Sequence, residues 1–130
     1  MKLGKLFSDF CFHDGDLVDI TINQDDIIMA FSLPIFLQNK QLKEVYKINE
    51  NSEASSLELV LRFTNFSRFQ SEPFVEIGNI DLDEYELWHI QGDEQNQETT
   101  IQLRKYGEDS LLTISFACRS VEIVSCEIKN

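Results

Sequence analysis

The sequence predicts a mainly β fold, an antiparallel β-sandwich or rolled sheet of seven to nine strands with one short helix at the N-terminus. Apolar and polar residues alternate along most of the chain, polar turns separate the alternating segments, and no β-α-β pattern is present. With 130 residues the chain is long enough to bury one core, so residues 1–130 are expected to form a single domain. The alternative class is α+β.

The N-terminal part of the chain is expected to form a helix, a turn and a hairpin. Four apolar residues within residues 2–10 recur at the spacing of one helix face, namely Leu3, Leu6, Phe7 and Phe10. A turn is expected at residues 13–16, where Gly15 supplies a permissive backbone. Strands follow at residues 16–22, with Val18, Ile20 and Ile22 on one face, and at residues 27–33, with Ile27, Met29, Phe31 and Leu33 on one face.

The middle of the chain contains the clearest strand pattern. Pro34 favours a bend, residues 45–48 are expected to form an edge strand, and residues 49–56 an exposed loop. From Leu57 to Phe63, every second residue is a leucine or a phenylalanine. This alternation predicts a strand in the centre of a sheet.

The C-terminal half is expected to contain four further strand segments. They cover residues 74–82 with a bulge at Gly78, residues 85–91, residues 99–106, and one long bent strand over residues 111–128. In the second of these segments, strict alternation places Tyr85, Leu87 and His89 on one face. Exposed turns are expected at residues 92–98 and 107–110.

The charge of the chain is strongly negative and unevenly distributed. Eleven Lys and Arg against 23 Asp and Glu give a net charge of −12, which disfavours binding to nucleic acid and to anionic membrane surfaces. Between Arg68 and Arg104 there are nine acidic residues and no lysine or arginine. Such a stretch is either a solvated face or a docking surface for a basic partner.

The cysteines and the N-terminus indicate a cytoplasmic protein. Cys11, Cys118 and Cys126 cannot all pair with one another, and none lies in a CxxC spacing. Reduced thiols are typical of the cytoplasm. The N-terminal segment contains no apolar signal core, and no run of the chain reaches the roughly 20 apolar residues that span a bilayer.

Sequence motifs for catalysis are few. Cys11 and His13 would share a face of an extended segment, as a thiol–imidazole pair requires, but no orienting group or oxyanion site accompanies them. A buried cysteine beside a locally bonded turn histidine is the preferred interpretation. The glycines are scattered, so no phosphate-binding loop can be assembled, and no serine lies in a GxSxG motif. We expect no cofactor and no catalytic residue.

A metal site is the alternative interpretation of the same turn. His13, Asp14 and Asp16 supply an imidazole and two carboxylates, and His89 is the only other histidine. The aspartate spacing lacks the glycine and the terminal glutamate of a calcium loop. Turn capping by these side chains is preferred. A metal-dependent enzyme or small-molecule binder around His13, or a structural oligomerising module, are the alternative functions.

Three segments carry a resemblance to a known group of proteins. Residues 12–20, FHDGDLVDI, resemble the start of the first strand in a group of small bacterial single-domain proteins. Residues 61–66, LRFTNF, are similar to their central strand, and residues 116–123, FACRSVEI, to their closing strand. Several members are catalogued as immunity proteins of polymorphic toxin systems, and many are uncharacterised. Cys11 and residues 34–56 have no counterpart in this pattern, and the group offers no catalytic residues.

The resemblance and the charge together imply a binding role. Immunity proteins occlude a toxin, and many toxins are basic nucleases that an acidic surface would attract and complement. Trp88 lies inside the acidic stretch, and tryptophan is enriched at the centres of protein interfaces. We therefore expect a non-enzymatic module that binds a basic protein partner through Asp81, Asp83, Glu84, Glu86 and Trp88.

Overall fold

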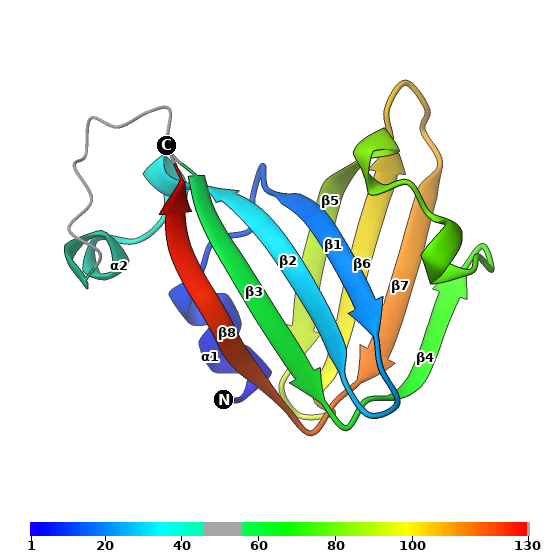
Figure 1. Cartoon of the computed structure of the whole chain (residues 1–130), viewed down its shortest axis with the longest axis horizontal. Helices are drawn as coiled ribbons and strands as arrows, with labels where there is room; N and C mark the ends of the chain where they lie inside the picture. The colour runs from blue at the N-terminus through cyan, green and yellow to red at the C-terminus, as the bar shows by residue number, and fades with distance from the viewer. Residues whose placement is uncertain (46–55, 130) are drawn as a thin grey trace.

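The chain folds into two stacked antiparallel sheets with a helix along one side (Figure 1). The computed structural model describes residues 1–45 and 56–129. Within these residues, eight strands form sheet A, in the order β1-β2-β3-β8, and sheet B, in the order β4-β7-β6-β5. The predicted mainly β sandwich with a short N-terminal helix is confirmed.

The elements have the following bounds. Sheet A contains β1 (Asp16–Ile22), β2 (Ile27–Pro34), β3 (Ser56–Thr64) and β8 (Ser120–Lys129). Sheet B contains β4 (Ser67–Glu72), β5 (Tyr85–Asp93), β6 (Glu98–Lys105) and β7 (Leu111–Ala117). The helices are α1 (Leu3–Asp9) and α2 (Lys40–Val45), and single 3-10 turns form η1 (Ile35–Leu37), η2 (Ile77–Asn79) and η3 (Leu82–Glu84). None of the helices in the described part of the chain is both long and apolar enough to cross a membrane.

The core lies between the two sheets and is rich in phenylalanine. Every second residue of β2 and of β3 is buried, and β3 pairs with β2 on one side and β8 on the other, which confirms its predicted central place. The Phe63 and Phe116 rings meet across the sheets with centroids 5.0 Å apart. Burying one such ring contributes about 1.5–3 kcal/mol to the free energy of folding. The alternating apolar residues of the strands therefore favour packing of the two sheets against each other.

Helix α1 closes one open side of the sandwich. It packs against β5 and β8, and its inward residues Leu3 and Leu6 are fully buried, as the helical spacing predicts. The approach to β5 requires a glycine, because a Cβ atom at Gly92 would lie 2.5 Å from the Phe7 ring. Gly92 lies within β5, which ends at Asp93. The exposed turn predicted for residues 92–98 therefore begins only after Asp93.

All four edge strands contain an irregularity, whereas the inner pairs β2–β3 and β6–β7 have none. The pairing register shifts in β1, β4, β5 and β8. In β1 the shift follows Leu17, so Leu17 points inward while Val18 is 53% exposed. The prediction that Val18 shares the core-facing side with Ile20 was therefore wrong. Bulges of this kind interrupt the regular edge that another strand would need for pairing.

Two predicted strands of the C-terminal half differ from the structure. Residues 74–82 form no strand but contain turn η2 and lead into η3, and Phe74 is 84% exposed. The expected long strand over residues 111–128 is two strands, because the chain leaves sheet B after Ala117 and enters sheet A at Ser120. The predicted edge strand at residues 45–48 and the loop at residues 49–56 fall largely outside the described residues, and Val45 ends α2.

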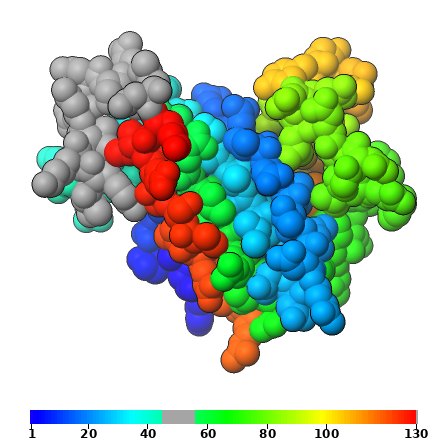
Figure 2. All heavy atoms as spheres, in the orientation of Figure 1, coloured from blue at the N-terminus to red at the C-terminus, as the bar shows by residue number. Residues whose placement is uncertain are grey.

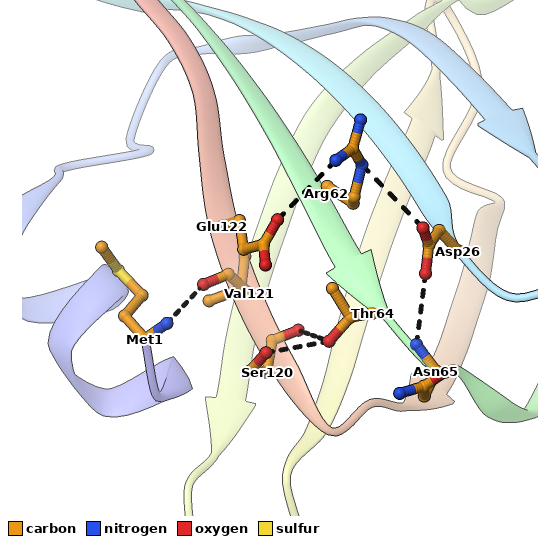
Figure 3. Close-up of polar contacts among 8 residues, drawn as sticks. All are labelled: Met1, Asp26, Arg62, Thr64, Asn65, Ser120, Val121 and Glu122. Atoms are coloured by element: carbon orange, nitrogen blue, oxygen red, sulfur yellow. Dashed lines mark hydrogen bonds and ion pairs between the residues drawn. The ribbon is translucent and has the colours of Figure 1, made fainter.

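A polar network joins β3 and β8 of sheet A beside the point where the chain crosses over from sheet B (Figure 3). The Thr64 carbonyl accepts a hydrogen bond from the Arg119 N–H at 2.8 Å, and the Thr64 and Ser120 hydroxyls lie 2.8 Å apart. Arg62 on the outer face of sheet A lies between two carboxylates, 3.9 Å from Asp26 and 3.7 Å from Glu122. The opposite end of the sandwich, where β1 begins, contains the candidate site.

Candidate functional site

A cleft opens where the segment before β1 meets strand β5. It consists of two adjacent pockets of about 450 and 370 Å³ that share His13, Leu87 and Trp88. The first pocket is lined further by residues Phe7 to Phe12 except Ser8 and Asp9, and by residues 89–92 of β5. The second is lined further by Asp14, Gly15, Asp16, Glu86, Arg104 and Tyr106. In Figure 2 the blue N-terminal segment and the green-to-gold segments border this notch.

Trp88 stands between the two pockets because β5 is bulged at this residue. The pairing with β6 shifts between Leu87 and His89, which leaves Trp88 without a residue opposite and 52% exposed. The shift also places Ile90, opposite the buried Ile101, on the inner side together with Leu87. The prediction that Leu87 and His89 share a face was therefore wrong, and His89 points outward toward Gln91.

Arg104 of β6 joins the two predicted contact residues of β5. Its guanidinium lies 4.2 Å from the centre of the Trp88 ring and forms an ion pair with Glu86. A cation over a tryptophan ring contributes about 0.5–1 kcal/mol at an exposed site, and the ion pair orients the guanidinium. Glu86 and Trp88, which the sequence predicted as contact residues, are thus held together in the second pocket.

The other three predicted contact residues lie beside the cleft, on turn η3. Asp81 accepts a hydrogen bond from the Asp83 N–H at 3.1 Å and so caps the turn, and Asp83 is exposed. Glu84 lies 3.6 Å from Lys105. The acidic stretch contains no lysine or arginine of its own, but strand pairing brings Arg104 and Lys105 of β6 against β5. An exposed pair such as Glu84–Lys105 contributes little to stability.

The turn at residues 13–16 forms the far wall of the second pocket. Asp14 takes the left-handed conformation with φ of 57°, a conformation that aspartate tolerates. Gly15 has a different role from the one expected, since a Cβ atom there would lie 2.7 Å from the Leu33 side chain. Partial burial, and next the charge of nearby Glu86, raise the pKa of the Asp16 carboxyl above its ordinary value.

The alternative metal site receives no geometric support. His13 is exposed, and its Nε2 atom lies 3.5 Å from Asp14 Oδ2. In residues 1–45 and 56–129, no three His, Cys, Asp or Glu side chains are grouped so that they would hold a metal ion. The residues His13, Asp14 and Asp16 do line one pocket, but as a mixed polar wall.

The wall of the first pocket depends on a buried glutamine. Gln38 Oε1 accepts from the Cys11 N–H at 3.0 Å, and Gln38 Nε2 donates to the Cys11 carbonyl at 2.8 Å. The amide thus binds the backbone of Cys11 as a neighbouring strand would. Cys11 and His13 both line this pocket, and among the described residues no hydrogen bond joins the Cys11 thiol to the His13 imidazole.

Sequence reasoning missed three residues that shape the cleft, namely Gln38, Arg104 and Tyr106. Gln38 lies in a segment without clear periodicity, and the other two are brought to Trp88 only by pairing of β6 with β5. Predicting that pairing would have required the register, since Glu86 lies opposite Arg104. We compared the chain with protein-family models, with curated proteins and with solved structures, and none of the three comparisons found a match.

Proposed function

We propose that this protein is a non-enzymatic binding module that holds a basic protein partner at the cleft around Trp88. The observation that carries the proposal is the exposed indole of Trp88, raised on a bulge of an edge strand between two pockets. A large aromatic side chain is normally buried, and an exposed one beside pockets is typical of the centre of a protein interface.

The charge around the cleft favours a basic partner. Asp14, Asp16 and Glu86 line the second pocket, and exposed Asp81 and Asp83 lie on the adjoining turn. The chain as a whole has a net charge of −12. Such a surface accelerates the encounter with a cationic protein and repels anionic ones, and salt weakens both effects.

The finer proposal is that the partner is a basic toxin and that this protein is its immunity protein. It is supported by the resemblance at residues 12–20, 61–66 and 116–123 and by the acidic cleft. The first of these segments contributes His13 to Asp16 to the cleft wall. The mechanism would be stoichiometric occlusion of the toxin, with Trp88 at the contact.

Co-expression tests both levels of the proposal. The product of the gene adjacent to the gene for this chain should be toxic alone and harmless with this protein, and the two should co-purify in equal amounts. If the adjacent product is not toxic, or if its toxicity persists, the immunity role is wrong. If the two proteins also fail to associate when purified, this partner is excluded and the binding role loses its support.

A matched pair of variants tests the site. Trp88→Ala should weaken the complex by about thirtyfold or more, the effect of a hot-spot residue worth about 2 kcal/mol. Phe36→Ala removes an aromatic ring that is 58% exposed and lines neither pocket, and it should change the dissociation constant less than twofold. Equal effects of the two variants would place the contact elsewhere.

A further inference from the structure

The second pocket already contains one cationic side chain, that of Arg104. Arg104 of the chain itself stacks over Trp88 at 4.2 Å and pairs with Glu86. Stacking on an aromatic face together with pairing to a carboxylate is the arrangement that suits a planar guanidinium. The walls of this pocket therefore bind an arginine head group in two ways at once.

Arg104 does not neutralise the pocket. Three carboxylates line it, those of Asp14, Asp16 and Glu86, against the single guanidinium of Arg104, which leaves two negative charges when His13 is neutral. Asp16 has no hydrogen-bond or ion-pair partner for its carboxylate among the described residues. Burial and the charge of Glu86 raise the pKa of Asp16, as expected where negative charge is in excess.

The pocket also has room and a second aromatic wall. Its volume is about 370 Å³, and Tyr106 is one of its lining residues, together with Asp14 and Asp16. Tyr106, Asp16 and Glu86 line this one pocket, and burial, followed by the charges of Asp16 and Glu86, raises the pKa of the Tyr106 phenol. An aliphatic stem can lie along the aromatic side chains while its charged end reaches a carboxylate.

We propose that this pocket accepts an arginine side chain of the partner, whose guanidinium pairs with Asp16 and lies against the aromatic side chains of Trp88 and Tyr106. This inference rests on the proposed function and adds the chemistry of the group that is recognised. Arginine is favoured over lysine because its planar guanidinium stacks on aromatic rings and binds carboxylates in a fixed geometry. The first pocket, with Phe10 and Phe12 in its walls, lies directly beside it and suits an apolar neighbour in the partner.

The test uses three short peptides that differ in one side chain. Acetyl-Gly-Arg-Gly-amide, its citrulline analogue and its lysine analogue are titrated into the ¹⁵N-labelled protein, and amide and indole chemical shifts are followed by NMR. The arginine peptide should shift the Trp88 indole and the amides of residues 13–16, whereas the uncharged citrulline analogue should shift them much less at the same concentration. Equal shifts from citrulline would overturn the proposal, and equal binding of lysine would overturn the preference for guanidinium.

Two variants complete the test. Asp16→Asn should weaken arginine-peptide binding about threefold to fivefold, as removal of one partly exposed charge pair does. Asp19→Asn, an exposed change on the same strand but outside the pocket, should leave it unchanged. Equal affinity of the two variants overturns the inference. If Trp88→Ala abolishes binding of the whole partner while Asp16→Asn leaves it intact, the binding function stands and the arginine pocket is wrong.

Discussion

Replacing Gln38 with alanine should release the segment that forms the wall of the first pocket. The buried Gln38 amide makes three hydrogen bonds, two to Cys11 and one of 3.0 Å to the Pro34 carbonyl. A net hydrogen bond contributes about 0.5–1.5 kcal/mol, and a buried polar group left unpaired costs about 1–3 kcal/mol. Because water can reach part of this region, we expect a loss of about 2–4 kcal/mol in the free energy of unfolding.

Urea unfolding measures this loss, and hydrogen exchange of the Cys11 amide shows where it occurs. Gln24→Ala is the matched control, because Gln24 is exposed in the β1–β2 turn, and it should change stability by less than about 0.5 kcal/mol. In the Gln38 variant, the Cys11 amide should exchange much faster. A Gln38 variant as stable as the Gln24 variant, or a Cys11 amide that keeps its protection, would contradict the role given to Gln38.

Charge and burial lead to three more predictions. Asp16→Asn should be more stable than Asp19→Asn at pH 7, because a raised pKa of the Asp16 carboxyl means that its ionisation destabilises the folded state. In urea unfolding, the difference in stability between the two variants should vanish below pH 3.8, the ordinary pKa of the carboxyl. Equal stability of the two variants at pH 7 would refute the argument. Cys118 should react with a thiol reagent far more slowly than Cys11, because burial raises the pKa of the Cys118 thiol to about 11, and equal rates would be inconsistent with this. Phe116→Ala should lower the free energy of unfolding by about 3–5 kcal/mol, and a loss below about 1 kcal/mol would disprove close packing around this ring.

The inner strands were predictable from the sequence because their periodicity is unbroken. In β2 and β3, every second side chain enters the core over the whole strand, and the pairing between them has no register shift. In a strand that packs against a core on one face, apolar and polar side chains alternate, so the alternation in the sequence predicts both the strand and its buried face. The helix from Leu3 to Asp9 was predictable for the same reason, since its apolar spacing matches the face that it buries.

The edge strands were less predictable because a bulge resets the alternation. The sequence around Val18 continues a perfect period of two, yet one extra residue in β1 turns Val18 outward. The same event at Trp88 separates Leu87 from His89. The position of a bulge depends on how the strand pairs with its neighbour and on its place at the edge of the sheet. The local sequence reports neither the pairing nor the place in the sheet.

The candidate site was predictable in part. The sequence could single out Trp88 and Glu86, because Trp88 lies inside an acidic stretch and tryptophan is enriched at the centres of protein interfaces. Their partner Arg104 is distant from them in the chain and reaches them through strand pairing. The sequence offers His13, Asp14 and Asp16 as an alternative metal site, and the fold places all three with Trp88 in the lining of one pocket.

Hydrogen exchange of this protein, alone and in complex with the product of the adjacent gene, tests the central proposal most directly. Binding at the cleft should slow exchange at residues 13–16 and 81–90, because these segments form its walls and rim. The outer face of sheet A, around Val60 and Arg62, should be unchanged. Protection confined to that outer face, with residues 81–90 unaffected, would contradict the assignment of the cleft as the contact surface.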